Sequence, residues 1–411
     1  MAAAPGEGPL RRRRRPGGLR AGRVHVDQSD HGVPEPGTGM TGGVVVTGYG
    51  VFTAFGWGEK ALRDGVFTGT QVFAPANRFD PTPFRTPMTA AAAGDPDLVD
   101  VLGGCADDAV DMAGLPPGTA GATLLGSAGD WKSVTRYSRG LDFSPGAGVP
   151  GVLAGAVADR VGFRGPRLAF TNACVASASA LIHGWRLITA GRQDVALCAG
   201  AYLVEEENMA KFDSGRTLSK DGVIRPFSLD RTGLLLGDGV AAIVLESEEH
   251  ALARGAQVLA RMTGFGVASD AFHIAKPHPE GRGIASAVSQ AFRRAGVSGV
   301  DYVNAHGTGT PANDGAETNG LRAALGTNTP ISSTKSTTGH MLEASGAVEF
   351  VVSLLALLDG AVPPTAGYTT PDPACDLDYV TEGPRRLALH RVLSLNAAFG
   401  GMNTAILLEQ P

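Results

Sequence analysis

The sequence has few cysteines, few aromatic residues and no long hydrophobic run. No apolar stretch approaches the roughly 20 residues that a membrane-spanning helix needs, so we expect neither a membrane span nor a membrane partner. The cysteines form neither a CxxC pair nor a zinc-ligand spacing, which predicts no metal site and a reducing, cytoplasmic location. They are Cys105, Cys174, Cys198 and Cys375.

Glycine, in contrast, is abundant. The chain has 58 glycines in 411 residues, roughly twice the usual frequency of about 7%. This favours tight turns and close backbone approaches over long helical bundles. The length allows one large domain or two fused halves, each with a sizeable core.

Positive charge is concentrated at the N-terminus. Residues 1–39 contain seven arginines, five of them in the run 11–15, against four acidic residues. The run has no interleaved aromatic residues and no apolar signal segment follows it, so we expect no nucleic-acid partner and no secretion. We interpret residues 1–42 as a disordered, arginine-rich leader, with an upstream-start artefact as the alternative.

The rest of the chain alternates short apolar runs with longer mixed segments, which is typical of an α/β protein with covered sheets. A charged stretch at 246–255 separates two such series. Glycine- and proline-rich stretches at 144–151 and 362–373 predict surface loops. The pattern predicts strands at 44–47, 168–171, 195–199 and 240–245 and helices at 176–190, 284–295 and 344–358.

Cys174 lies where a predicted strand ends and a helix of very small residues begins. Residues 172–177 read NACVAS. A thiol at a helix N-terminus is expected to have a lowered pKa, and small neighbours allow a substrate to approach. This favours a nucleophile, although a buried structural cysteine is the alternative for this segment alone.

Two histidines occupy similar loops in the second series. His306 follows a predicted strand in the segment NAHGTGT, and His340 ends the segment STKSTTGH before another small-residue helix. Loops rich in glycine and hydroxyl groups are poor places for core histidines. Together with the elbow cysteine, the pair indicates a catalytic site.

These three segments resemble the signature loops of elongating β-ketoacyl-carrier-protein synthases, the ketosynthases of type II fatty-acid and polyketide biosynthesis. The resemblance continues through residues 225–227, 237–239, 269–273, 313–317 and 396–403 and covers 44–409. It implies a thiolase-like, five-layered αβαβα fold built from two similar halves, 43–250 with the nucleophile and 251–411 with both histidines. It also implies a dimer, either of identical chains or with a second ketosynthase-like subunit.

The resemblance implies an acyltransferase that carries out a decarboxylative Claisen condensation. Cys174 would hold the acyl chain, while His306 and His340 would donate hydrogen bonds to the malonyl thioester as carbon dioxide leaves. Backbone N–H groups of Cys174 and Phe399 would form the oxyanion hole. The substrates would be carried on the phosphopantetheine of an acyl carrier protein, with no further cofactor.

The family also implies roles for neighbouring residues. Lys335 would support the second histidine electrostatically, although an ion pair that only holds the loop is the alternative. Glu317 matches a supporting loop carboxylate. The pantetheine arm and the gate of the pocket would be formed by Thr308, Thr310, Phe399 and Gly400.

The sequence departs from the family at three places. Ser177 replaces the glycine of the usual elbow, residues 126–161 are short and contain Asp130-Trp131-Lys132, and residues 205–207 are three glutamates. Because such regions shape the acyl pocket and the dimer contact, these departures indicate a specialised, secondary-metabolic synthase.

Other members of the fold remain as alternatives. A non-elongating partner, like the chain-length factors, lacks the cysteine; a thiolase carries a second reactive cysteine that Cys375 matches poorly; an initiating synthase has asparagine in place of His340. A non-catalytic scaffold would not need three intact loops. For the carrier-protein patch the candidates are Arg63, Arg78, Arg136 and Arg139.

Overall fold

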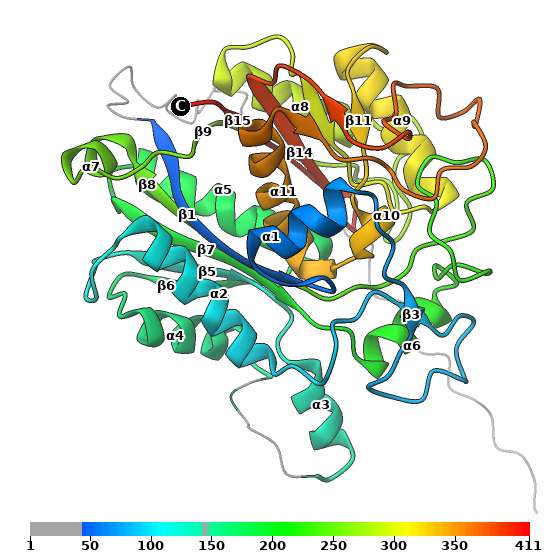
Figure 1. Ribbon diagram of the computed structural model, residues 1–411, viewed down its shortest axis with the longest axis horizontal. Coiled ribbons are helices and arrows are strands. Elements are labelled where there is room, and N and C mark those ends of the chain that lie inside the picture. The colour runs from blue at the N-terminus through cyan, green and yellow to red at the C-terminus, as the bar shows by residue number, and fades with distance from the viewer. Residues whose placement is uncertain (1–42, 142–145, 147) are drawn as a thin grey trace, which may run out of the picture. The chain divides into compact units, whose positions relative to one another are not determined.

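The computed structural model describes residues 43–141, 146 and 148–411 (Figure 1). The predicted leader, residues 1–42, lies outside the described residues, as does most of 142–147. Within the described part, no helix combines the length and the hydropathy of a membrane span.

Two sets of five strands form the central sheet, which is continuous because the first strands of the two sets pair with each other. The first set comprises β1 (Val44–Thr53), β5 (Ala122–Gly126), β6 (Arg167–Phe170), β7 (Val195–Tyr202) and β8 (Gly239–Ser247). The second comprises β9 (Ala260–Ser269), β10 (Tyr302–Asn304), β11 (Ile331–Ser332), β14 (Arg391–Ala397) and β15 (Met402–Glu409).

The two sets repeat one topology. Their strands are ordered β6-β5-β7-β8-β1 and β11-β10-β14-β15-β9, which is the same order when each set is numbered along the chain. The pairing directions also agree, with the inner pairs β5·β7 and β10·β14 parallel and the pairs β7·β8 and β14·β15 antiparallel. The fold therefore consists of two similar halves.

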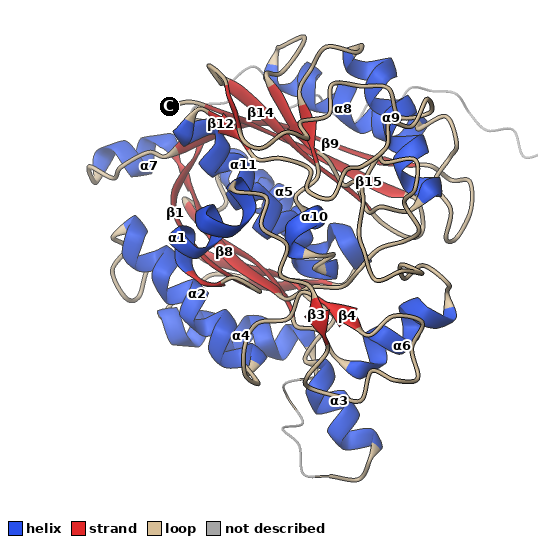
Figure 2. Ribbon diagram, turned by 45° about the vertical axis from the view of Figure 1, so that its right-hand side comes forward, coloured by secondary structure: helices blue, strands red, loops and turns tan. Residues whose placement is uncertain are grey.

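Helices alternate with the two sheet halves to give five layers (Figures 1 and 2). One outer pair covers the first half and another covers the second, while the third pair lies between the halves. The three pairs are α2 (Leu98–Ala113) with α4 (Pro150–Val161), α8 (Arg282–Ala295) with α9 (Pro311–Leu325), and α5 (Ala176–Thr189) with α11 (Ser345–Asp359).

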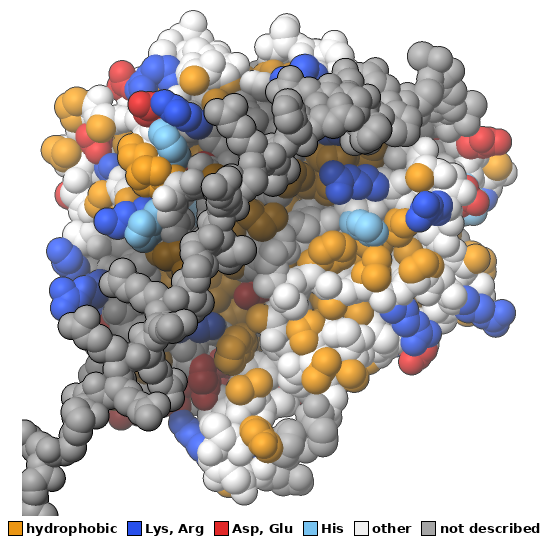
Figure 3. All heavy atoms as spheres, turned by 180° about the vertical axis from the view of Figure 1, so that it is seen from behind, with side chains coloured by type: hydrophobic (Ala, Val, Ile, Leu, Met, Phe, Trp, Pro, Cys, Tyr) orange, Lys and Arg blue, Asp and Glu red, His pale blue; other side chains and the backbone are white. Residues whose placement is uncertain are grey.

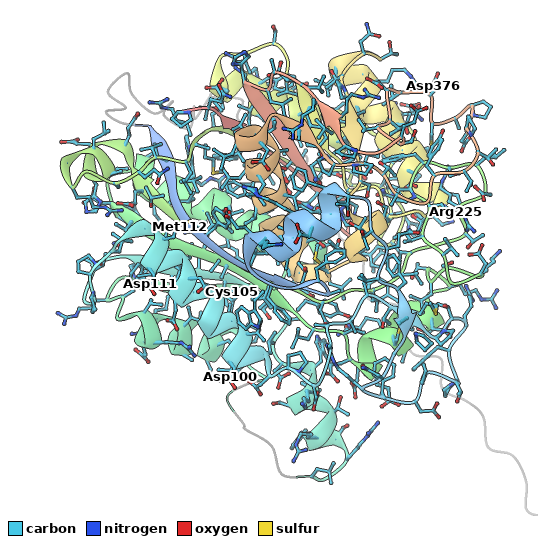
Figure 4. All side chains as sticks on the ribbon, viewed as in Figure 1. Asp100, Cys105, Asp111, Met112, Arg225 and Asp376 are labelled. Carbon is cyan, nitrogen blue, oxygen red and sulfur yellow. The ribbon has the colours of Figure 1, made fainter. Side chains whose placement is uncertain are left out.

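An outer helix has one polar face. In α2, Cys105 is buried against the sheet, whereas Asp100, Asp111 and Met112 are exposed (Figure 4). The central helix α11 is instead buried over almost its whole length. A helix that is apolar on every side belongs in the interior, and α11 packs against both halves.

Glycines explain why β1 extends to Thr53, beyond the predicted 44–47. Gly48 and Gly50 lie against α2, where a Cβ would overlap backbone carbonyl oxygens of that helix. In the second half, Gly264 and Gly266 of β9 lie against α8 in the same way. What the composition suggested as turns is here close packing of a helix on a strand.

Ser177, the residue that replaces the elbow glycine, connects the two central helices. Its Oγ accepts a hydrogen bond from the backbone N–H of Ala347 at 2.9 Å. Ala344 at the N-cap of α11 has no side chain that could do so. The serine thus satisfies one of the free N–H groups at the start of the neighbouring helix.

The remaining elements lie around these layers. They are β2 (Gly56–Trp57), α1 (Gly58–Leu62), a π-helical turn (Arg63–Phe67), β3 (Ala74–Pro75), β4 (Met88–Thr89), α3 (Trp131–Ser138), α6 (Glu206–Ser214), α7 (Glu248–Ala253), α10 (Lys335–Thr338), β12 (Ala361–Val362) and β13 (Arg385–Arg386). The predicted loop at 144–151 is shorter than expected because α4 begins at Pro150. Two 3₁₀ turns, Ala173–Val175 and Leu342–Ala344, precede the central helices.

Candidate active site

A cavity of about 610 Å³ brings together the cysteine of the first half and the histidines of the second. Cys174, His306 and His340 all line it, with Thr308, Thr310 and Phe399. The face opposite that of Figure 1 is hollowed, with hydrophobic side chains gathered around the hollow (Figure 3). Side chains that lie far apart in the sequence therefore share one chamber.

Cys174 lies in the 3₁₀ turn between β6 and α5, after Ala173, whose φ is 55°. Burial raises the pKa of its thiol to about 12, and the charge of Glu343 adds to this, while Lys335 opposes it. The lowering of this pKa that was expected from the helix N-terminus is therefore not found. The thiol is only 6% exposed, and desolvation outweighs the helix end.

His306 follows β10, and its loop is held by a buried carboxylate. Glu317 accepts hydrogen bonds from the backbone N–H groups of His306 at 2.6 Å and Gly307 at 2.7 Å. Glu317 does not line the cavity, and burial raises its pKa to about 7. Burial first, and then Lys335, hold the pKa of His306 well below its usual range, so the imidazole is neutral.

His340 is neutral for the same reasons, since burial and Lys335 lower its pKa well below the usual value. Its Nδ1 accepts a hydrogen bond from the backbone N–H of Leu342 at 3.2 Å and lies 3.2 Å from Ser345 Oγ. Because Nδ1 is an acceptor, the ring proton belongs on Nε2. The rings of His306 and His340 lie edge to face with centroids 5.2 Å apart.

Lys335 is buried beneath the cavity and does not line it. Its Nζ lies 2.5 Å from Oε1 of Glu349, and the other oxygen of Glu349 accepts a hydrogen bond from Asn396 at 2.6 Å. Both side chains of the pair are fully buried. Lys335 thus forms an ion pair with Glu349 and also lowers the pKa values of both histidines. These are the two effects that the sequence suggested as alternatives.

Thr308 and Thr310 line the cavity, and their hydroxyl oxygens lie 2.8 Å apart. Phe399 is 49% exposed and stacks on Phe212 of α6, with ring centroids 5.9 Å apart. Its backbone N–H has no acceptor among the residues that the structure describes. Gly400 lies beside the cavity instead of lining it, and its N–H donates to the carbonyl of Ile274 at 2.8 Å.

Two of the unusual segments pack against each other. The Nζ of Lys211 in α6 lies 4.5 Å from the centroid of the Trp131 ring in α3, and Arg139 pairs with Glu206. Since α6 lines the cavity, residues 130–132 and 205–207 affect its wall from the outside. This packing connects the departures from the family pattern to the pocket.

Several polar residues of the cavity wall were not predicted. They are Asn208, Lys211, Arg216, Asp270, Lys276, Asn313 and Glu343. The signal for Asn208, Lys211, Arg216 and Lys276 is weak, because side-chain directions in α6 and in the loops depend on the fold. Asp270, and Asn313 in α9, lie in segments that resemble the family, and Glu343 follows His340 by three residues, so these three could have been found by reading the motifs further.

The four arginines suggested for the carrier-protein patch are not cavity residues. Arg78 is a clear error, because it is 4% exposed and forms a buried ion pair with Asp238. Arg63 pairs with Asp359 at 2.9 Å, and Arg139 with Glu206. Local charge balance in the sequence does not reveal pairing across almost 300 residues.

Comparison with known proteins identifies the group to which this architecture belongs. Residues 68–251 match the model of the β-ketoacyl synthase N-terminal domain, and residues 259–369 match that of the C-terminal domain. The chain is 36% identical to a putative polyketide β-ketoacyl synthase 1 of Streptomyces cyaneus over 90% of this chain and 99% of the relative. The chain belongs to the β-ketoacyl synthase family.

Further relatives agree. A 3-oxoacyl-[acyl-carrier-protein] synthase 2 of Coxiella burnetii is 32% identical over 89% of this chain and 98% of its own. The solved structure of the ishigamide ketosynthase/chain length factor superposes with a TM-score of 0.84 at 30% identity, covering 90% of this chain and 99% of that one. The predicted family, thiolase-like fold and acyltransferase class are confirmed.

Proposed function

We propose that this β-ketoacyl synthase condenses an acyl chain held on Cys174 with a malonyl unit carried on an acyl carrier protein, in type II polyketide or specialised fatty-acid biosynthesis. The observation that carries the proposal is the shared cavity of one thiol and two neutral imidazoles. A non-elongating partner subunit would not need this set.

In the first step the Cys174 sulfur attacks the carbonyl carbon of the incoming acyl thioester. The bond to the pantetheine sulfur breaks, and the proton of the Cys174 thiol leaves with the pantetheine thiol. Because burial raises the pKa of this thiol, it loses its proton during the attack instead of resting as a thiolate.

In the second step malonyl thioester loses carbon dioxide, and the electrons of the broken C–C bond form an enolate. His340 donates from Nε2 to the enolate oxygen, and His306 is the second donor. A neutral, preorganised donor suits this task, and removing one such donor typically costs 10²–10³-fold in rate, about 3 to 4 kcal/mol.

In the third step the enolate carbon attacks the acyl carbonyl on Cys174. The oxyanion accepts hydrogen bonds from the backbone N–H groups of Cys174 and Phe399. Collapse of the oxyanion breaks the C–S bond and releases the β-ketoacyl product on the carrier protein, and the Cys174 thiolate that leaves takes up one proton from solvent.

The carrier protein is proposed to dock at exposed basic residues around the cavity. Arg216 and Lys276 line it and are exposed, and neither side chain forms an ion pair or hydrogen bond within the described part of the chain. Carrier proteins are acidic in the family that the chain belongs to, and local basic charge steers such partners.

A second subunit of the same fold is proposed to cover strand β6. The equivalent edge strand of the second half, β11, is covered by its own chain, since Ile331 exchanges hydrogen bonds with Asp378 and Val380 at 2.9 Å. Strand β6 lies at the other edge of the sheet, where no strand of the described residues pairs with its outer side, and it exposes Leu168. An uncovered apolar edge is a ready site for strand pairing.

Mass spectrometry of the intact protein tests the function. After incubation with an acyl carrier-protein thioester, we expect an added acyl mass on Cys174, and a β-ketoacyl product once malonyl carrier protein is added. Absence of the adduct with every acyl group would contradict the proposal and favour a non-elongating partner. Sedimentation analysis of the chain alone distinguishes a homodimer from a subunit that needs a different partner.

A further inference from the structure

The cavity contains two polar groups that the condensation does not use. One is the carboxyl of Glu343, whose Oε2 is buried without a hydrogen-bond partner in the described part of the chain. The other is the amide of Asn208 on α6, which is 1% exposed and whose Nδ2 also lacks a partner there. Buried polar atoms are normally hydrogen-bonded, so each such atom needs an explanation.

The backbone gives Glu343 the same place in the second half that Cys174 has in the first. Each is the middle residue of a 3₁₀ turn that precedes a central helix. Each follows a residue with positive φ, 55° for Ala173 and 42° for Leu342. The local geometry that presents the sulfur to the cavity therefore presents the carboxyl to it as well.

Glu343 and Cys174 are close enough to interact electrostatically. Glu343 is the largest cause, after burial, of the raised pKa of Cys174. Its own pKa is raised by burial, and the charge of Lys211 opposes this only in part. Because both residues line one cavity and Cys174 would carry the thioester carbonyl, we expect the first carbons of a bound acyl chain to lie near this carboxyl.

A saturated alkyl chain would bury both polar groups without partners. A chain with an oxygen near the thioester would accept a hydrogen bond from the Asn208 amide and pair with Glu343. A hydroxyl oxygen can pair with the carboxyl in either protonation state, because a hydroxyl both donates and accepts hydrogen bonds. A ketone oxygen only accepts, so it can pair with the carboxyl only when the carboxyl is protonated. Leaving such groups unpaired is what makes a polar site reject an apolar analogue.

We propose that Glu343 and Asn208 are specificity-determining residues that select an acyl chain bearing a hydroxyl or keto oxygen within a few carbons of the thioester. This inference rests on the proposed function, because the chain that it selects is the one transferred to Cys174. It assigns Glu343 to substrate choice and not to proton removal from the thiol.

The test compares pantetheine thioesters of hexanoate, 3-hydroxyhexanoate and 3-oxohexanoate, with acylation of Cys174 followed by intact-protein mass. In the unmodified protein we expect kcat/KM at least tenfold higher for an oxygenated chain than for hexanoate. Glu343→Leu and Asn208→Leu should each remove most of that preference by slowing the oxygenated chains and accelerating hexanoate. The two oxygenated thioesters distinguish a hydroxyl from a ketone.

Glu207→Gln is the matched control. It changes a partly buried glutamate that precedes Asn208 on helix α6, whose Oε2 also has no partner among the described residues and which does not line the cavity. We expect it to leave the preference unchanged.

Three outcomes are separable. Equal acylation by all three thioesters in the unmodified protein would overturn the inference while leaving the proposed function intact. A Glu343→Gln variant that loses acylation equally with every thioester would assign Glu343 to proton transfer and also overturn it. No acylation by any thioester would contradict the proposed function itself.

Discussion

The turns before the two central helices have one backbone design and different chemistry. In the first half the turn carries Cys174, and in the second it carries Glu343, with His340 just before it. Both turns follow the third strand of their half, and both helices begin with small residues. The duplication therefore supplies two equivalent positions facing one cavity.

Burial, and not the N-terminus of the following helix, determines the pKa shifts of the ionisable side chains in and beside both turns. It raises the pKa values of Cys174 and Glu343 and lowers those of the histidines. Burial thus favours the neutral forms of Cys174 and of both histidines, and it shifts Glu343 in the same direction. This site is therefore arranged to donate and accept hydrogen bonds, and charge develops in it only during the reaction.

Removing the thiol of Cys174 should have the largest effect on activity. Cys174→Ala should abolish acylation and condensation, because the variant has no nucleophile. It should still release carbon dioxide from malonyl carrier protein, since both histidines remain. Intact mass and carbon dioxide release measure the two activities.

Cys198→Ala is the control for this variant. Cys198 is fully buried on β7, outside the cavity, and its Sγ lies 3.5 Å from the carbonyl oxygen of Ala180. It should acylate normally. An acyl adduct on the Cys174→Ala protein would show that another residue is the nucleophile.

Changing His340, which lies just before the second turn, should separate the two half-reactions. His340→Ala should keep acylation at Cys174 but lose 10²–10³-fold, about 3 to 4 kcal/mol, in decarboxylation and condensation, because one enolate donor is gone. Single-turnover mass measurements follow acylation, and product formation follows condensation. His390→Ala, at an exposed residue that does not line the cavity, should change neither. Equal loss of acylation and condensation would refute this division of roles.

The sequence predicted the parts of this site that depend on local pattern. Cys174, His306 and His340 were found because strand ends and glycine-rich loops mark reactive positions, and the structure brings all three into one cavity. The strands and helices around them were predicted within a few residues, except that β1 extends past its glycines.

Features that depend on burial or on distant partners could not be predicted. The raised pKa of Cys174 comes first from burial and then from Glu343 of the other half. Arg78 seemed a surface residue until its buried pairing with Asp238 was known. The equivalence of Glu343 to Cys174 becomes visible only when the two turns are compared in three dimensions. The sequence does not reveal it, because the two halves share their topology but not their motifs.

The ion pair below both turns should matter for stability and for pH dependence. Lys335→Met leaves the buried carboxylate of Glu349 without its cation, which typically costs about 3 to 5 kcal/mol. Urea unfolding should register the loss, and the additional change Glu349→Gln should restore part of it, since a neutral amide needs no cation. A loss below about 1 kcal/mol would contradict a structural role.

The Lys335→Met variant should also shift the pH dependence of decarboxylation, through the pKa values of the two histidines. Lys335 helps to hold the pKa values of His306 and His340 below their usual range. Without it these values rise, so the rings take up protons at a higher pH as the solution is acidified. Decarboxylation should therefore fall off at a higher pH in the Lys335→Met protein than in the unmodified one. An unchanged acid limb would mean that burial alone keeps the rings neutral.

The smallest effect is expected at the rim of the cavity, where we propose that the carrier protein docks. Arg216→Glu and Lys276→Glu should each raise KM for a carrier-bound acyl substrate several-fold, with less effect at high salt because exposed charges are screened. Reaction with a free pantetheine thioester should hardly change, since that substrate does not dock. Arg192→Glu makes the same charge change at an exposed residue outside the cavity and should leave both substrates unaffected. Equal losses with both substrates would instead locate the damage in the pocket, and no loss with either variant would place the docking surface on another face.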